Sequence, residues 1–265
     1  GSEMGIRVRR NQRLGWGANL LNPGKGGGDI IWMCQDRYGL CLDDLLSVKM
    51  TYNDVYNYSG TRETLIMEKA LVQKGVWASD RNTSRVMRLN QQNMKIYIEE
   101  DIYLNTFLST PGSVEQLLED RQGNLWIITS TTLLLKPANT QKLIVATDDM
   151  PRMSRLTVDG NGKVWGVSAD KTICTLNYAA NTITCEQKTH IPNLSGQEMI
   201  SHVCMDKEAC LWMITSLGRI YKSDKEKQTF ESMPLENNIE DCSVLSLLAD
   251  ENSVWISTNK RIIQY

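Results

Sequence analysis

Tryptophan recurs along this chain at a nearly constant spacing. The tryptophans stand at positions 16, 32, 77, 126, 165, 212 and 255, and from Trp32 onward the gaps are 45, 49, 39, 47 and 43 residues. A period of this length is typical of proteins built from one repeated supersecondary unit. The composition of 41% hydrophobic and 23% charged residues is that of a globular protein. Seven Trp against two Phe is an unusual ratio, so the spacing of the tryptophans is the most informative feature of the sequence.

The residues around the tryptophans recur in register. Each copy has an apolar stretch, an Asp-centred turn and a Leu/Val-Trp run at hairpin distance, and Gly123 and Gly162 are available for a positive φ angle in two of the turns. The segment at Ile30–Cys34 is the weakest match. The clearest copies are residues 117–130, 156–168 and 203–216, and shorter ones cover 71–79 and 247–258.

Two further short stretches follow each Trp run. A third apolar stretch occurs at 133–135, 173–176 and 219–221, and a fourth, more polar one at 142–145, 182–185 and 228–231. Four short antiparallel strands in about 45 residues form the blade of a β-propeller, and no helical period is evident. We therefore predict an all-β propeller in which each Trp lies on the second strand and packs between neighbouring sheets.

The units counted from Trp32 predict six four-stranded blades in a single domain spanning residues 1–265, with residues 1–4 interpreted as the remnant of an expression tag. The last unit has only three strands, ending at Tyr265, whereas Ile6–Arg10 has a strand pattern that precedes unit one. If these two ends pair, residues 6–10 complete blade six and Trp16–Leu21 begins blade one. The alternative is a fragment of a seven-bladed propeller.

The consensus Asp-x-x-Gly-x-Leu/Val-Trp-Ile followed by Thr/Ser resembles the two-component regulator propeller repeat. The resemblance spans about residues 65–265 and is clearest at Asp120–Ser130, Asp159–Ser168 and Asp206–Ser216. The chain departs from that family where Gly-Thr usually follows Trp-Ile, because Ile128-Thr129 and Ile214-Thr215 stand there.

The resemblance implies a role in signalling. Proteins of this family form the extracytoplasmic sensor part of hybrid histidine kinases in polysaccharide-degrading Gram-negative bacteria. We therefore expect a periplasmic, non-enzymatic sensor domain that recognises a carbohydrate or oligosaccharide, with kinase activity in other segments and a homodimer formed through the parent sensor. The alternatives are a protein-interaction scaffold, which would fit a cytoplasmic location, and a propeller glycosidase or lyase.

The loops that lead into the first strand of each blade are the expected binding region. They include residues 110–113, 150–153, 195–198 and 238–241. Arg152 and Gln197 carry donors for sugar hydroxyl groups, and Trp16, outside the period, offers a ring for stacking on a sugar. These three residues are the candidate ligand-binding residues.

Six of the seven cysteines fall into pairs placed symmetrically about turns. Directly opposed strand residues lie within the range that a disulfide bridges, which fits an oxidising compartment. The alternative is that these cysteines are small apolar strand residues and that the symmetry is accidental. The predicted disulfides are Cys34–Cys41, Cys174–Cys185 and Cys204–Cys210.

Several function classes find no support in the sequence. His190 and His202 are the only histidines and lie in no metal-ligand spacing, and the Gly-rich run at 24–29 lacks the end of a phosphate-binding loop, so we predict no metal, cofactor or catalytic residue. A formal net charge of −2 without a basic stripe argues against nucleic acid. No apolar run reaches about 18 residues, so we expect no direct membrane insertion of this segment.

Overall fold

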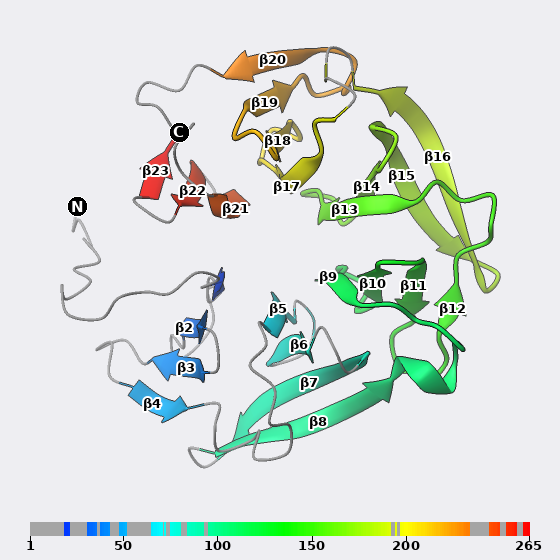
Figure 1. The fold of residues 1–265 in the computed structure, drawn as a ribbon, viewed down its shortest axis with the longest axis vertical. Coiled ribbons are helices and arrows are strands. Elements are labelled where there is room, and N and C mark those ends of the chain that lie inside the picture. Colours follow the sequence, from blue (N-terminus) through cyan, green and yellow to red (C-terminus); the bar gives the residue numbers. More distant parts are fainter. Residues whose placement is uncertain are drawn as a thin grey trace.

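The structure is a computed structural model of the chain. It describes residues 19–21, 31–35, 38–42, 48–51, 65–70, 72, 75–80, 84–92, 95–191, 194, 197–233, 244–249, 253–258 and 262–265, and everything below concerns these residues. They form six antiparallel sheets arranged around a central axis (Figure 1). The helical structure among them is a single 3-10 turn at Leu104–Thr106. The predicted all-β propeller is confirmed.

Five of the sheets have four strands each, and the sixth has three. Blade one comprises β1 (Asn19–Leu21), β2 (Ile31–Gln35), β3 (Tyr38–Leu42) and β4 (Val48–Thr51). Blade two comprises β5 (Leu65–Lys69), β6 (Val76–Asp80), β7 (Arg85–Gln92) and β8 (Lys95–Tyr103). Blade three comprises β9 (Val114–Glu119), β10 (Leu125–Thr129), β11 (Leu133–Lys136) and β12 (Ile144–Val145).

The second half of the chain repeats this order. Blade four comprises β13 (Met153–Val158), β14 (Val164–Ser168), β15 (Thr172–Ala179) and β16 (Thr182–His190). Blade five comprises β17 (Ile200–Met205), β18 (Leu211–Thr215), β19 (Ile220–Ser223) and β20 (Phe230–Met233). Blade six comprises β21 (Val244–Ala249), β22 (Val254–Thr258) and β23 (Ile262–Gln264).

The first strand of each blade lies next to the axis, and the later strands follow outward (Figure 1). These inner strands meet their neighbours in the order β1, β5, β9, β13, β17 and β21, and β21 also contacts β1. The ring is therefore closed at its inner edge. The predicted closing strand Ile6–Arg10 lies outside the described residues.

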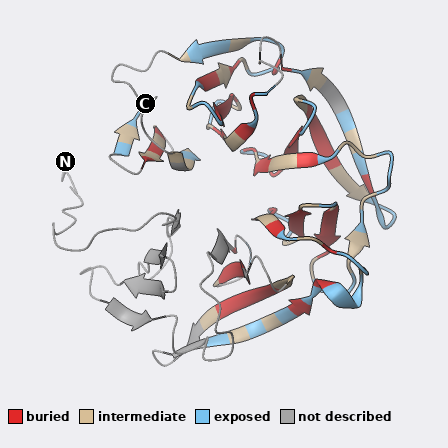
Figure 2. Cartoon of the chain, in the orientation of Figure 1, coloured by how far each residue is buried: buried red, intermediate tan, exposed pale blue. Residues whose placement is uncertain are grey.

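The tryptophans lie on the second strand of every blade, as predicted, and the side chains of Trp77, Trp126, Trp165 and Trp212 pack in clusters that join one blade to the next. Trp126 packs with Leu156 and Leu176 of blade four, and Trp212 packs with Val254 and Ile256 of blade six. Figure 2 shows buried residues along the second and third strands, and every residue of β10, β11, β14 and β18 is buried. Much of the core is thus formed by contacts between adjacent blades.

An aspartate holds three of the β-turns and the tryptophan that follows each of them. In blade three, Oδ1 of Asp120 accepts the backbone N–H groups of Gln122 and Asn124, both at 2.9 Å, and Oδ2 accepts Nε1–H of Trp126 at 2.9 Å. Asp159 and Asp206 make the same three bonds in blades four and five. This is why an aspartate stands six residues before each of these tryptophans.

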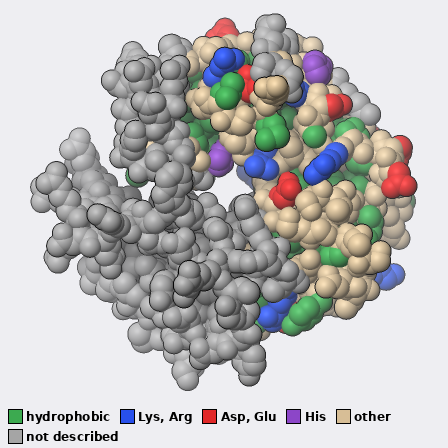
Figure 3. Space-filling view, in the orientation of Figure 1, with side chains coloured by type: hydrophobic (Ala, Val, Ile, Leu, Met, Phe, Trp, Pro, Cys, Tyr) green, Lys and Arg blue, Asp and Glu red, His purple; other side chains and the backbone are tan. Residues whose placement is uncertain are grey.

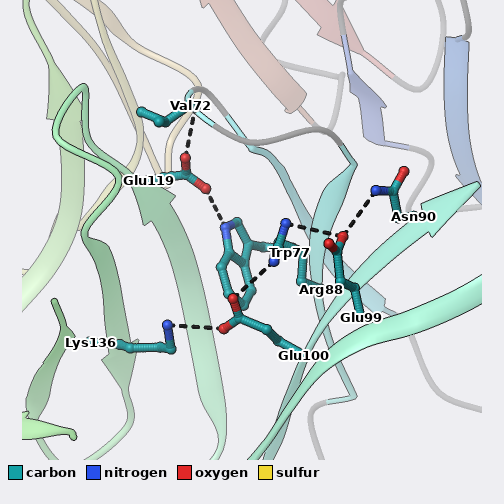
Figure 4. Close-up of polar contacts among 8 residues, drawn as sticks. All are labelled: Val72, Trp77, Arg88, Asn90, Glu99, Glu100, Glu119 and Lys136. Atoms are coloured by element: carbon teal, nitrogen blue, oxygen red, sulfur yellow. Dashed lines mark hydrogen bonds and ion pairs between the residues drawn. The ribbon is translucent and has the colours of Figure 1, made fainter. Parts of the chain in front are cut away.

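Blade two lacks that aspartate, because Leu71 stands six residues before Trp77. The indole N–H of Trp77 instead bonds to Oε2 of Glu119, which is at the end of β9 in blade three, and Oε1 of Glu119 accepts the backbone N–H of Val72 at 2.8 Å (Figure 4). A cross-blade carboxylate therefore replaces the local one.

Charged side chains surround Trp77 at this junction (Figure 4). Arg88 lies 5.7 Å and Lys136 5.8 Å from the centre of its ring, and both contact Glu100, at 2.9 Å each. Arg88 also lies 3.1 Å from the carboxylate of Glu99. Because Arg88 and Lys136 are buried, their charges depend on these carboxylates in place of water.

Candidate functional site

The antiparallel order of the strands divides the loops between two ends of the propeller. The Asp-centred turns lie at one end, and the connections from one blade to the next lie at the other, together with the turns between second and third strands. We call the latter the crossover end. Loops carried on a rigid sheet scaffold are the usual place for binding residues. Of the loops that the sequence predicted to bind ligand, residues 110–113, 150–153 and 197–198 lie at the crossover end, whereas residues 195–196 and 238–241 lie outside the described residues.

Arg152 lies at the crossover end between blades three and four. Its side chain is exposed, and one amino group, Nη2, donates to the carbonyl oxygen of Ser130 in the β10–β11 turn at 2.7 Å. Its own carbonyl accepts the backbone N–H of Ala169 from the β14–β15 turn at 2.8 Å. The bond to Ser130 holds the exposed guanidinium beside the β10–β11 turn, and the bond from Ala169 holds the backbone of Arg152 beside the β14–β15 turn.

Next to Ala169, the exposed Asp170 is held as a carboxylate. The hydroxyl of Ser168 donates to its Oδ1, and this hydrogen bond, with those from Thr172, outweighs the opposing effect of burial, so the pKa of Asp170 lies below its ordinary value. The crossover end of blade four therefore presents a cation at Arg152 and an anion at Asp170. The backbone hydrogen bond from Ala169, the neighbour of Asp170, to Arg152 holds the two segments together.

Gln197 lies on the connection into β17 and is exposed, as a ligand-binding residue must be. The next residue, Glu198, is buried, and its Oε2 is 3.3 Å from Nη1 of Arg219 in the β18–β19 turn. The structure thus places Arg152 and Gln197 at the same end, on the connections into adjacent blades. Trp16, the third candidate, lies outside the described residues.

Two apolar side chains are also exposed at this end. Met199 is 69% exposed and Leu217 is 55% exposed. The backbone N–H of Ser216 donates to the carbonyl of Met199 at 2.7 Å, which holds the β18–β19 turn beside the connection into β17. Blade five therefore carries apolar surface beside the polar groups of Gln197 and Arg219.

Sequence reasoning missed a third group of residues, on the inner strands beside the axis. Each of β9, β13 and β17 contains a β-bulge near its crossover end, and the residues that follow the bulges are Gln116, Arg155 and His202. A bulge inserts an extra residue and redirects the side chains around it, which a repeat aligned on tryptophan does not reveal. All three side chains are half-buried.

The predicted disulfides are not supported by the observed strand registers. Cys34 pairs with Gly39, Cys185 with Leu176 and Cys204 with Trp212, so no predicted pair is directly opposed. The turns are not centred where the symmetry of the sequence suggested, and a bulge between Ile173 and Thr175 further shifts the register near Cys174. No disulfide joins Cys174 to Cys185 or Cys204 to Cys210. The geometric argument for these bridges was wrong.

Within the described part of the chain, no group of three or more His, Cys, Asp or Glu side chains is arranged to hold a metal ion. His190 is exposed at the end of β16, whereas His202 is on an inner strand of blade five. Over the same residues, no helix has the length and apolar character needed to span a membrane.

Comparison with known proteins identifies the repeat. The family model of the two-component regulator propeller matches residues 109–131, which cover the connection into blade three, β9, the Asp120 turn and β10. The resemblance drawn from the sequence is confirmed on this segment. Among curated proteins, none matches the chain by sequence.

Solved structures share the propeller fold at low sequence identity. Virginiamycin B lyase from Staphylococcus aureus superposes with a TM-score of 0.67 at 12% identity, covering 96% of this chain and 85% of that one. The extracellular domain of a putative hybrid two component system from B. thetaiotaomicron gives a TM-score of 0.63 at 16% identity, covering 90% of this chain and 32% of that one. At these identities the likeness establishes the fold alone.

Proposed function

We propose that the chain is an extracytoplasmic, non-enzymatic sensor domain of a two-component signalling protein and that it binds a carbohydrate at its crossover end. The observation that carries the proposal is the two-component regulator propeller match at residues 109–131, on a propeller whose fold is shared with a hybrid two-component extracellular domain. Kinase activity would belong to other segments of such a protein.

The chemistry of the crossover end supports a carbohydrate ligand. Sugar hydroxyl groups both donate and accept hydrogen bonds, so they need donors and acceptors side by side. Arg152 and Gln197 supply donors, Asp170 and the Gln197 amide oxygen supply acceptors, and Met199 offers apolar surface for a sugar ring. Arg152 is already held by Ser130, which lowers the entropic cost of ordering its side chain on binding.

A thermal-shift screen with defined oligosaccharides tests this function. A ligand present at about 100 times its Kd stabilises the folded state by about 2.7 kcal/mol, which raises the unfolding temperature measurably. We expect at least one oligosaccharide to stabilise the wild type and the effect to shrink in Arg152→Ala and Gln197→Ala. Lys225→Ala, an exposed change between β19 and β20 at the opposite end, serves as the control. Stabilisation by no oligosaccharide would contradict carbohydrate binding.

A protein-binding role is the second candidate, and the exposed Met199 and Leu217 favour it. Large exposed apolar side chains at one site mark protein interfaces when they form a contiguous patch. The partner we test is a second copy of the chain, because a sensor of this family would act as a dimer. Light scattering after size exclusion should then show a dimer for the wild type and a monomer for Leu217→Ser. A monomeric wild type would contradict this role.

A further inference from the structure

Two exposed aromatic residues lie on the connection from blade two to blade three. Tyr103 ends β8, the outermost strand of blade two, and is 48% exposed (Figure 1). Phe107 directly follows the 3-10 turn at Leu104–Thr106 and is 46% exposed. Within the part of the chain that the structure describes, these are the two most exposed aromatic side chains. We call Tyr103 and Phe107 the rim pair.

The backbone that carries the rim pair is held by the fold. Leu104 is fully buried in the core cluster between blades two and three, and its N–H donates to the carbonyl oxygen of Ser84 at 2.9 Å. The carbonyl oxygen of Leu104 accepts the N–H of Phe107 at 3.0 Å, and the hydroxyl of Thr106 donates to the carbonyl oxygen of Tyr103 at 2.7 Å. This segment is thus ordered without a ligand, which lowers the entropic cost of binding one.

A cation holds the ring of Tyr103. Cζ of Arg85 lies 5.1 Å from the centre of this ring, and Nε and Nη2 of Arg85 donate to the carboxylate of Asp101 at 2.7 and 2.6 Å. The two bonds fix the guanidinium, and its contact with the ring is attractive. The ring of Tyr103 is therefore held in one orientation while about half of the residue stays exposed, and such a ring is suited to stacking on the apolar face of a sugar.

The surroundings of the rim pair favour a carbohydrate over a protein partner. Protein interfaces on a surface are marked by contiguous apolar patches. Figure 3 shows that, over the described atoms of the face in view, hydrophobic side chains are scattered among polar ones. A sugar needs an apolar ring surface with hydrogen-bonding groups beside it. Exposed polar residues lie between and after the two rings, at Asn105, Thr106, Ser109 and Thr110.

The connection that carries the rim pair also leads to Arg152. The carbonyl oxygen of Ser113 accepts the N–H of Ser130 at 2.8 Å, and the carbonyl oxygen of Ser130 accepts Nη2–H of Arg152 at 2.7 Å. The chain from Phe107 to Ser113 can span no more than about 20 Å. A ligand that contacts both the rim pair and Arg152 must therefore be an oligosaccharide of several sugar residues.

We propose that Tyr103 and Phe107 form an outer carbohydrate subsite, on which one sugar of an extended oligosaccharide stacks while another part of the same molecule contacts Arg152. The choice of a carbohydrate rests on the proposed function. The position of the subsite rests on the exposed rings, the turn that holds them and the polar residues around them. Only a long oligosaccharide reaches both places, so the subsite distinguishes long oligosaccharides from short ones.

Calorimetric titration with oligosaccharides of two lengths tests the subsite. The probes are the trisaccharides and hexasaccharides of cellulose, xylan, mannan and laminarin. For at least one of these polymers we expect the hexasaccharide to bind the wild type about threefold to tenfold more tightly than the trisaccharide, which is the contribution of one aromatic contact. The double variant Tyr103→Ala/Phe107→Ala should lose this difference. Tyr97→Ala, which removes another exposed ring of β8, is the matched control and should keep it.

Two single variants keep the test decisive if the double variant fails to fold by circular dichroism. Phe107→Ser removes one ring and should reduce the difference between the two lengths, whereas Phe107→Tyr keeps a ring and should preserve it. A difference that survives in the folded double variant, or equal binding of both lengths to the wild type, would overturn the subsite and leave carbohydrate binding at the crossover end intact.

Arg152→Ala separates the subsite from the proposed function. Hexasaccharide binding that depends on the rim pair but not on Arg152 would support the aromatic contact and contradict the proposed role of Arg152. Binding of both lengths that depends on Arg152 but not on the rim pair would overturn the subsite and support the proposed function. Binding of none of these oligosaccharides would overturn the subsite.

Discussion

The indole N–H of Trp77 in blade two donates to the carboxylate of Glu119 in blade three. In blades three to five the acceptor for the corresponding tryptophan is an aspartate of the same blade. The junction between blades two and three therefore depends on a hydrogen bond that crosses it, and the buried charges of Arg88 and Lys136 lie around the same ring.

Glu119→Gln should destabilise the protein by about 1–3 kcal/mol, because a buried donor loses its partner. The amide keeps one acceptor oxygen, so it cannot accept from both Trp77 and the backbone N–H of Val72, as the carboxylate does. Urea unfolding followed by tryptophan fluorescence measures the change. Glu99→Gln is the matched control, since this half-exposed carboxylate pairs with Arg88 near solvent and should contribute less than about 1 kcal/mol. Equal effects of the two substitutions would contradict a special role for Glu119.

Asp159 should contribute stability that is lost in acid. Burial opposes its ionisation, but hydrogen bonds from Trp165 and from the backbone of Lys163 and Asn161 outweigh burial, so its pKa lies below the ordinary value of 3.8. A carboxyl group whose pKa is lower in the folded than in the unfolded state stabilises the fold above the unfolded value, and this contribution disappears as pH falls through the folded value.

Asp159→Asn should therefore be less stable than the wild type at pH 7, and the difference should shrink as pH falls below about 4. Urea midpoints measured from pH 7 to pH 3 test this expectation. Asp148→Asn, a change of an exposed aspartate in the loop before β13, is the control for a general charge effect. A difference that stays constant with pH would show that ionisation of Asp159 does not matter.

The repeat made most of the fold predictable from sequence, because Asp120, Trp126 and their equivalents bond to each other within one hairpin. Because the two partners lie in one hairpin, a fixed number of residues separates them in the sequence, and this spacing predicts the contact. The pairing of Trp77 with Glu119 and of Arg155 with Ser201 joins different blades, so no spacing reveals it. The disulfide predictions were wrong for a related reason. Two cysteines placed symmetrically about an expected turn are opposed only if the turn has its centre at that position and no bulge shifts the strand register.

Glycines two residues apart in the Asp159 turn should differ in their response to alanine. Gly162 has φ +85°, and a Cβ there would meet the side chain of Arg121 at 3.1 Å, whereas a Cβ on Gly160 meets nothing within 4 Å. Gly162→Ala should cost about 1 kcal/mol or more, and Gly160→Ala should be neutral or slightly stabilising. The unfolding temperatures of the two variants, measured against the wild type, test this difference. A larger loss for Gly160→Ala would contradict the conformation of this turn.

Cys204 should resist alkylation in the folded protein. Burial raises the pKa of its thiol, and the nearby charge of Asp206 adds to that effect, so little of the reactive thiolate forms at pH 8. Burial and Asp206 also raise the pKa of Cys210, whereas Cys185 is half-buried on β16. Native labelling with iodoacetamide, read by peptide mass spectrometry, should modify Cys185 faster than Cys204. In denaturant without reductant, both Cys204 and Cys210 should be labelled. Protection of both cysteines until reductant is added would show instead that a disulfide joins them.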